Sequence, residues 1–246
     1  MNLKALFPWC DNASKVGGGE DLPMPSFLPR MKNMISAGFS PKCIFDCGAS
    51  VGHWSYEVSK LFPGSQILAV EPNAKIIPQT QKTLASVTPN VIIEECALGE
   101  SLGEAYLNIW DNDQTKMSGS SLKAHVQGEA KDKMKVRLET LDNLCEKHGL
   151  MPDLVKLDLQ GGEQEALKGA EAVLRAAEVV IIEFGCLPAY VDRTTPLDLM
   201  DTMYKNDYCL YDIIDLIYRP YDNALTGGDF IFAKNNSMLK KYKAYR

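Results

Sequence analysis

The stretch KCIFDCGASVGH, residues 42–53, changes within twelve residues from an apolar run to a glycine-containing turn and then to a helical pattern. Ile44 and Phe45 suit a buried strand, because β-branched and aromatic residues favour strands. Gly48 and Gly52 let the chain turn sharply and let a ligand approach the backbone. A strand, such a turn and a helix N-terminus together form a ligand crevice at the carboxyl end of a parallel sheet. The stretch therefore predicts an α/β protein with a ligand at this turn.

The charge at this turn favours a cationic ligand. A pyrophosphate cofactor needs the pattern G-x-G-x-x-G, but Ser50 and His53 stand where the second and third glycines should be. Asp46, at the end of the strand, repels a pyrophosphate and attracts the sulfonium of S-adenosylmethionine. Glu71 ends the next apolar run, where an acid can accept both hydroxyls of an adenosine ribose. Because Glu71 suits NAD and S-adenosylmethionine equally, Asp46 and the broken glycine pattern decide for S-adenosylmethionine.

Composition and length favour a single globular domain. The chain has 246 residues, of which 46% are hydrophobic and 24% charged, and no apolar run approaches the roughly 18 residues of a membrane span. The N-terminus lacks the long apolar segment and cleavage site of a secretion signal. A net charge of −6 and a pI near 5.2 argue against a nucleic-acid partner. Seven cysteines without a C-x-x-C pair fit reduced thiols, so we expect a cytoplasmic protein and leave homo-oligomerisation open.

The order of predicted elements indicates a doubly wound sheet. Residues 1–41 are expected to form a loop and a helix that packs on the core, and residues 42–246 the catalytic domain. Alternating strands and helices over residues 42–98, with residues 91–98 as the third strand, predict one half of the sheet. Residues 99–137 are interpreted as added β-structure, with a polar loop at 111–121 that could close over a substrate or simply be solvated.

The second half repeats the opening pattern. A strand ends in Asp158, a double glycine follows, and a helix is predicted over residues 163–176. A fifth parallel strand carries Glu183, and two final strands bring the main sheet to seven. If the first and fourth strands flank the switch point of the sheet, then Asp46, Asp158 and Glu183 lie along one edge.

Five segments follow one another along the chain: DCGASVG (46–52), EP (71–72), GSSL (119–122), LETLDNL (138–144) and KLDLQGGE (156–163). In this order they resemble the FkbM-type S-adenosylmethionine-dependent methyltransferases. The last is similar to the family's K-x-D-x-E-G-x-E, although Gln160 replaces a common glutamate and Gly162 a common alanine. We therefore assign no charge-dependent role to Gln160. The resemblance implies a class I methyltransferase fold, Rossmann-like and doubly wound, and usually O-methylation of a hydroxyl on a sugar or natural product.

The predicted cofactor-binding residues are those of the two glycine and acid turns and of the third strand. They are Asp46, Gly48, Ala49, Ser50, Gly52, Glu71, Pro72, Cys96 and Ala97. The competing interpretation of the first turn is a tight strand-to-helix connection without a ligand, and that of Cys96 and Ala97 is core packing.

The predicted catalytic residues are Lys156, Asp158, Glu163 and Glu183. Asp158 is chosen as the proton acceptor, because the end of its strand should lie nearest the transferable methyl group; a structural ion pair with Lys156 is an equal alternative. Glu163, at a helix N-terminus, is expected to have an orienting role.

Two other residues and a metal site are further functional candidates in the same crevice. His53 is interpreted as a solvated residue of a first helical turn, and Tyr190 as a residue that could stack on an acceptor. Asp158 and Glu183 could hold Mg²⁺ through their oxygens, but we expect a metal-independent enzyme.

The sequence leaves two rival functions open. One is a nicotinamide-dependent oxidoreductase, and the other is a non-catalytic module that binds an adenosyl ligand. The second would need the half of the sheet with Asp46 and Glu71, but not the carboxylates Asp158 and Glu183.

Overall fold

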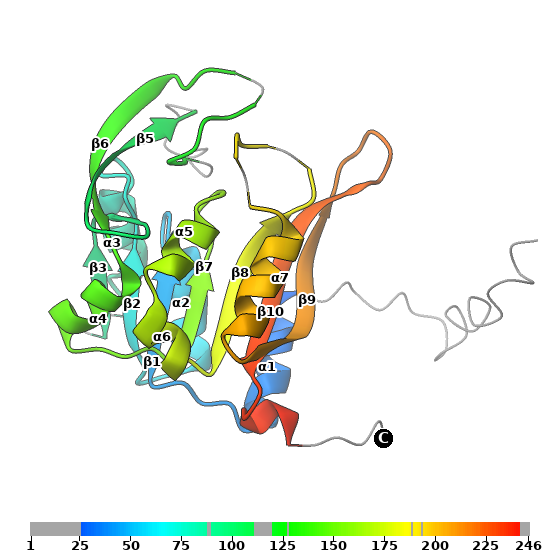
Figure 1. Ribbon diagram of the computed structural model, residues 1–246. Helices are drawn as coiled ribbons and strands as arrows, with labels where there is room; N and C mark the ends of the chain where they lie inside the picture. The colour runs from blue at the N-terminus through cyan, green and yellow to red at the C-terminus, as the bar shows by residue number, and fades with distance from the viewer. Residues whose placement is uncertain are drawn as a thin grey trace, which may run out of the picture.

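The computed structural model describes residues 26–241 except 88–89, 111–119, 127, 188 and 193. Its centre is a seven-stranded sheet (Figure 1). In spatial order the strands are β3 (Val91–Glu94), β2 (Gln66–Val70), β1 (Cys43–Cys47), β7 (Leu154–Leu157), β8 (Val179–Gly185), β10 (Leu225–Lys234) and β9 (Tyr208–Tyr218). The first five are parallel, whereas β10 runs antiparallel to both of its neighbours. This is the class I methyltransferase arrangement, so the predicted fold class is confirmed.

Helices cover both faces of the sheet, because successive side chains of each buried strand point to opposite sides. On one face, Phe45 packs in a cluster with residues of α4 (Leu141–His148), α5 (Glu163–Lys168), α6 (Glu171–Ala176) and α7 (Pro196–Lys205). On the other face, Ile44 packs in a cluster with residues of α1 (Phe27–Ser36) and α2 (His53–Leu61). The same face also carries α3 (Ile77–Leu84), and a short 3₁₀ turn (Met238–Lys240) follows β10.

The predicted N-terminal helix is present as α1. Its Met31 and Met34 are completely buried against β1 and α2, and its N-terminus is held by Asp215 of β9, which accepts the backbone N–H of Phe27 at 3.1 Å. The division into residues 1–41 and 42–246 stays a prediction. No helix in the described part of the chain is long and apolar enough to cross a membrane.

The prediction of one strand over residues 91–98 is wrong. The chain leaves the main sheet after β3, and Ala97–Leu98 forms β4 in a second sheet of order β4-β6-β5, with β6 at Asp132–Glu139 and β5 at Gly103–Ile109. The side chain of Arg137 on β6 bonds to both Glu94 and Glu139, so a long-range ion pair fixes the crossing point. The predicted added β-structure is thus a three-stranded sheet, and most of the polar loop at 111–121 lies outside the described residues.

The prediction of one helix over residues 163–176 is also wrong, because α5 ends at Lys168 and α6 begins at Glu171. Gly169 lies against the chain at Gly99, where an added Cβ would be only 2.4 Å from the Gly99 carbonyl oxygen. The carboxylate of Asp142 accepts the backbone N–H groups of Ala172 and Val173 and so supports the start of α6. A close contact between distant segments breaks the helix.

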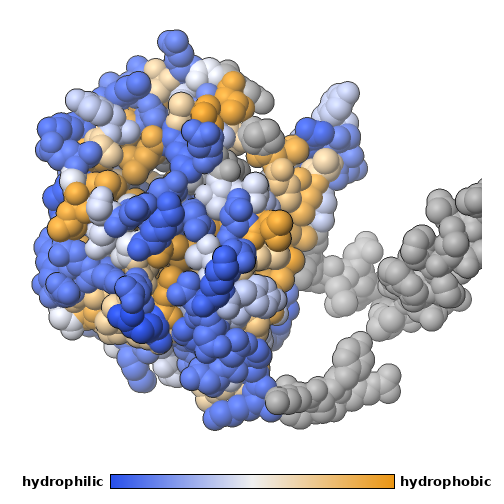
Figure 2. Space-filling view, viewed as in Figure 1, coloured by the Kyte–Doolittle hydropathy of each residue, from blue (hydrophilic) through white to orange (hydrophobic). Residues whose placement is uncertain are grey.

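Figure 2 shows one face of the molecule, on which apolar and polar side chains are interspersed. The second sheet stands above the carboxyl end of the main sheet in Figure 1. It therefore adds a wall to the crevice that the parallel strands provide.

Candidate active site

The turn after β1 lies directly against the end of β7. Gly48 has a φ of 88°, and a Cβ at this position would lie 1.9 Å from the carbonyl oxygen of Asp158. Only glycine permits this approach, because a side chain would both strain the backbone and overlap the neighbouring loop. The register of β1 with β7 pairs Asp46 with Lys156, as expected if these strands flank the switch point.

Asp46 lies beneath this turn and is completely buried. Its Oδ2 accepts a hydrogen bond of 2.6 Å from the Ser55 hydroxyl, and its Oδ1 lies 4.0 Å from the Lys156 ammonium. Burial raises the pKa of Asp46, and Lys156 and Ser55 oppose that shift. The carboxylate thus supports the turn from below and does not line the pocket above it.

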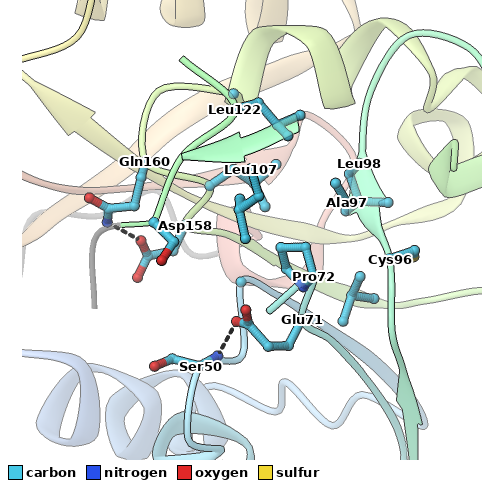
Figure 3. Close-up of a pocket in the computed structure, with 15 residues that line it drawn as sticks. Ser50, Glu71, Pro72, Cys96, Ala97, Leu98, Leu107, Leu122, Asp158 and Gln160 are labelled. Atoms are coloured by element: carbon cyan, nitrogen blue, oxygen red, sulfur yellow. Dashed lines mark hydrogen bonds between the residues drawn. The ribbon is translucent and has the colours of Figure 1, made fainter. Parts of the chain in front are cut away.

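A pocket opens where the ends of β1, β2 and β7 meet β4 and β5 (Figure 3). The space inside the pocket and at its open mouth is together about 720 Å³. It is lined by Gly48, Ser50, Val70, Glu71, Pro72, Cys96, Ala97, Leu98, Leu107, Ser120, Leu122, Asp158, Leu159, Gln160 and Gly162. Of the predicted cofactor-binding residues, Asp46, Ala49 and Gly52 are the ones that do not line it.

Glu71 stands at the floor of the pocket in a fixed orientation. Its Oε2 accepts the backbone N–H of Ser50 and its Oε1 that of Asn73, each at 2.8 Å. Burial raises the pKa of Glu71 to about 7, and the nearby carboxylates Asp46 and Asp158 add to that rise against the two N–H donors. Each carboxylate oxygen keeps a lone pair, so Glu71 could accept two hydroxyl groups from a ligand.

Apolar residues form the side of the pocket next to Glu71. Pro72, Cys96, Ala97 and Leu98 lie there, and in Figure 3 they face Asp158 and Gln160 across the pocket. An apolar slot beside a carboxylate suits a flat heteroaromatic ring joined to a diol-bearing sugar. The residues present therefore fit an adenosine.

The opposite side carries a network of charged and amide groups. The Lys156 ammonium donates to Oδ2 of Asp158 at 2.8 Å, and the Gln160 amide donates to Oδ1 at 2.9 Å. The same amide donates to Oε2 of Glu183 at 3.2 Å. Burial alone would raise the pKa of Asp158, but the charge and hydrogen bond of Lys156 and the bond from Gln160 lower it. Asp158 is therefore ionised at the pocket surface.

Glu163 has a different position from the one that an orienting role toward a substrate would need. It is only 2% exposed, and its Oε1 accepts the backbone N–H groups of Leu159 and Gly161 at 2.9 and 3.1 Å. Burial raises its pKa. Its carboxyl group holds the turn after β7, so it acts on Asp158 and Gln160 through the backbone.

Of the two further candidates, Tyr190 contacts a residue that lines the pocket, and His53 does not line it. The Tyr190 hydroxyl donates to Oε1 of Gln160 at 2.9 Å, and its ring lies over Gly161, where an added Cβ would approach it to 3.2 Å. His53 is the exposed first residue of α2 and does not line the pocket.

The sequence did not identify the roof of the pocket or the amide at its edge. Leu107 of β5 and Leu122 come from the second sheet and its loop, which the alternating pattern predicted only as β-structure. The sequence analysis assigns no charge-dependent role to Gln160. In the structure its amide hydrogen-bonds to both Asp158 and Glu183. The segment GSSL could have indicated the roof, since Ser121 donates a bond of 2.8 Å to the Gln160 carbonyl oxygen.

The carboxylates named as metal candidates do not form a ligand set. In the ranges that the structure describes, no group of three or more His, Cys, Asp or Glu side chains could hold a metal ion. The expectation that the enzyme needs no metal stays a prediction.

Residues 46–211 match the Methyltransferase FkbM domain family, which is more than half of the chain, so the protein belongs to this family. Membership supports S-adenosylmethionine-dependent methyltransferase activity, with S-adenosylmethionine as the cofactor. The resemblance seen in the sequence is thereby confirmed. No curated protein matches the sequence significantly.

Solved structures with the same general arrangement are distant in sequence. One is precorrin-6y C5,15-methyltransferase from Geobacter metallireducens, with 16% identity and a TM-score of 0.48, over 88% of this chain and 93% of that chain. Another is the N-terminal domain of EvdMO1 in the presence of SAH and D-fucose, with 11% identity and a TM-score of 0.47, over 88% and 85%. Similarity at this level carries no argument about the methyl acceptor of this chain.

Proposed function

We propose that this protein is an S-adenosylmethionine-dependent O-methyltransferase that methylates a hydroxyl group of a sugar, a glycan or another natural product. The observation that supports it most is the ionised carboxylate of Asp158 on the pocket wall, across from the apolar slot and Glu71. A fixed carboxylate is a hydrogen-bond acceptor for an incoming hydroxyl group.

In this proposal the apolar slot at Pro72, Cys96, Ala97 and Leu98 binds the adenine, and Glu71 accepts hydrogen bonds from the ribose hydroxyls. Gly48 lines the pocket and lets the turn after β1 lie against the end of β7, and Ser50 supports Glu71 through its backbone N–H. Asp46 contributes at a distance, by holding Lys156 and the turn after β1 in place. Ala49 and Gly52 shape the same turn.

The bound cofactor supplies an electrophilic methyl group on a sulfonium. Transfer to an oxygen is an in-line displacement, so the main work of the protein is alignment of the two reactants in a dry pocket. Asp158 orients the acceptor hydroxyl and takes its proton as the new C–O bond forms, while Gln160 and Lys156 keep the carboxylate pointed at the pocket. Because these two donors lower its basicity, Asp158 serves best when the proton is transferred late.

We also propose that the protein works in the cytoplasm on a small acceptor and without nucleic acid. The cysteines within the described ranges are all free thiols, and the net charge of the whole chain is −6. Both properties agree with a reducing compartment and with a partner that is not a polyanion.

The test of the cofactor is a comparison of ligands. S-adenosylmethionine and its demethylated product should raise the melting temperature of the protein, and NAD should not, since the glycine pattern of a pyrophosphate site is broken. The reverse result would show a nicotinamide-dependent oxidoreductase. Binding without any methyl transfer to a broad set of hydroxyl compounds would instead favour the non-catalytic module.

The test of O-methylation uses the cofactor labelled with ¹³C in its methyl group. The product should show the NMR resonance of a methyl group on oxygen. A methyl resonance typical of nitrogen, sulfur or carbon would leave the enzyme class standing and overturn the assignment of the acceptor atom.

A further inference from the structure

Three aromatic rings form a row that leads away from Asp158, beyond the amide of Gln160. Tyr190 donates to Gln160 at 2.9 Å, the His125 ring packs edge-on against Tyr190 at a centroid distance of 5.4 Å, and Trp110 packs edge-on against His125 at 5.5 Å. Trp110 follows β5 and Tyr190 follows β8, so the row joins the second sheet to the main sheet. We refer to Trp110, His125 and Tyr190 as the aromatic row.

The pairing of two segments fixes the position of His125 against Tyr190. His125 and Tyr190 form an antiparallel bridge, flanked by hydrogen bonds from Val126 N–H to the Ala189 carbonyl at 3.0 Å and from Val191 N–H to the Ala124 carbonyl at 2.8 Å. Residues opposite one another in such a bridge point to the same face, and their neighbours point to the other.

Val126 and Val191 are therefore on the outer face, and they are indeed about half exposed. Tyr190 is on the inner face, against Gly161 and Gln160. Figure 1 shows the loop after β8 in the upper part of the molecule, above β8 and α7, on the side where the main parallel strands end. The rings of His125 and Trp110 are partly exposed, and Tyr190 connects them to Gln160, which lines the pocket beside its proposed reacting end.

The chemistry of the aromatic row suits the apolar face of a carbohydrate ring. Aromatic side chains provide rigid contact area, and the indole N–H of Trp110 adds a polar edge that can bond a ring hydroxyl. The Trp110 Nε1 is a buried donor without a hydrogen-bond partner among the residues that the structure describes. An unsatisfied donor of this kind is uncommon in a folded protein, and a ligand oxygen would satisfy it after a small rotation of the ring.

The charge around the reacting end argues against an anionic acceptor. The carboxylates Asp158, Glu183 and Asp229 lie close to one another there, and Lys156 is the cation that interacts with Asp158 and Asp229. Nearer the aromatic row, the Lys123 ammonium is already bonded to the Asp192 carbonyl at 2.7 Å and lies 3.1 Å from Glu165. A phosphate or a nucleotide diphosphate would meet mostly negative charge.

We propose that the aromatic row is a distal acceptor subsite, and that the acceptor is an uncharged glycan of at least two sugar rings. This proposal rests on the proposed function. The first ring presents its hydroxyl to Asp158, and a second ring lies on His125 and Trp110. Gln160 and Tyr190 come between Asp158 and the other two rings in this series of contacts, so we assign the two ends to different sugar rings.

The experiment measures binding of the full-length protein, saturated with S-adenosylhomocysteine, to a glycan array. The probes are neutral di- and trisaccharides, the corresponding methyl monosaccharides, and the corresponding sugar 1-phosphates and uridine diphosphate sugars. We expect retention on neutral oligosaccharides, and weak or no retention on single rings and on the anionic sugars. Trp110→Ala should lower affinity for the best oligosaccharide roughly tenfold, the worth of one aromatic contact.

Two further variants separate recognition from folding. Trp110→Phe keeps an aromatic ring and should remain within about threefold of the unmodified protein, because stacking on a ring is retained although the indole N–H and part of the contact area are lost. Tyr221→Ala removes an exposed tyrosine at the β9–β10 hairpin and should have no effect. The melting temperature and the affinity for S-adenosylhomocysteine are measured for every variant, to confirm that each is folded.

Strongest retention on anionic sugars, equal retention on one and two rings, or no neutral oligosaccharide retained would overturn the subsite. The same holds if Trp110→Ala, with normal S-adenosylhomocysteine affinity, binds oligosaccharides as well as the unmodified protein does. Failure of the unmodified protein to bind S-adenosylhomocysteine is a different result, because it removes the proposed function itself.

Discussion

Glu71 and Asp158 are two carboxylates of one pocket, and their surroundings shift their pKa values in opposite directions. Glu71 is held by neutral backbone donors, and burial raises its pKa to about 7. Asp158 is bonded to an ammonium and an amide, and its pKa is lowered. The same residue chemistry thus gives one group that titrates near neutral pH and one that stays ionised. The difference separates a group suited to cofactor binding from one suited to acceptor positioning.

The largest effect is expected from removal of the charge at the acceptor end. Asp158→Asn should lower single-turnover methyl transfer by roughly 10²–10⁴, the usual worth of a positioned general base, while cofactor affinity changes only a few-fold. Rapid-quench kinetics with saturating cofactor measure it. Glu183→Gln is the matched control, because Glu183 shares the Gln160 amide but does not line the pocket. A normal Asp158→Asn enzyme beside an inactive Glu183→Gln enzyme would move the base to β8.

The next effect concerns the cation that keeps Asp158 ionised. Lys156→Met leaves Asp46 and Asp158 without their buried partner, which should lower the free energy of unfolding by about 3–5 kcal/mol. Without Lys156 the folded-state pKa of Asp46, which burial already raises, rises further, and that of Asp158 rises above its value in the unfolded chain. Their ionisation then costs stability increasingly as pH rises, so the loss should be smaller at pH 5 than at pH 8.

Urea unfolding at the two pH values measures this difference. The exposed pair of Lys60 with Glu57 provides the control, since Lys60→Met should change stability very little. A loss that is equal at both pH values would indicate that Lys156 stabilises the fold by packing and not by charge.

A smaller effect is expected at the cofactor end, as a dependence of affinity on pH. If ribose hydroxyls bond to ionised Glu71, binding favours the deprotonated form, so affinity for S-adenosylhomocysteine should rise roughly tenfold or more from pH 5.5 to pH 8 and level off above the pKa of about 7. Titration calorimetry measures it. Glu71→Gln should bind roughly 10- to 100-fold more weakly at pH 8 and lose the pH dependence.

Another acid could produce a similar slope. Burial raises the pKa of Asp229 to about 6, against the attraction of Lys156. If the Glu71→Gln protein keeps the same pH dependence, the titrating group is not Glu71, and Asp229→Asn becomes the variant to measure.

Much of the fold could be predicted from local sequence, because glycine turns and acids at strand ends are local signals. The rule that the first and fourth strands flank the switch point correctly placed Asp46 beside the strand of Asp158. The break after β3 could not be predicted, since it depends on the ion pair of Glu94 with Arg137, 43 residues away in the chain. The break at Gly169 depends in the same way on a contact with Gly99.

At the site, too, the sequence could not predict features that depend on the depth and orientation of side chains in the fold. The spacing of residues indicates which strand end carries a carboxylate, but not how deeply that carboxylate is buried. Asp46 is buried beneath the turn, whereas Asp158 lines the pocket. The role of Gln160 depends on which way its amide points, and the hydroxyl of Tyr190, 30 residues away, determines that orientation. A substitution that looks like a lost charge in the sequence is a hydrogen-bonded link in the structure.

The smallest expected effect is that of metal removal, for which we predict no change in turnover. A Mg²⁺ ion between Asp158 and Glu183 would need oxygen lone pairs on both carboxylates to face one point. That position is taken by the Gln160 amide, whose nitrogen donates to one oxygen of each, while Lys156 donates to the second oxygen of Asp158. A cation would have to displace an amide donor and sit close to an ammonium, which costs both hydrogen bonds and charge repulsion. Methyl transfer should therefore continue at an unchanged rate in EDTA, and loss of activity that Mg²⁺ restores would show that the amide gives way to a metal.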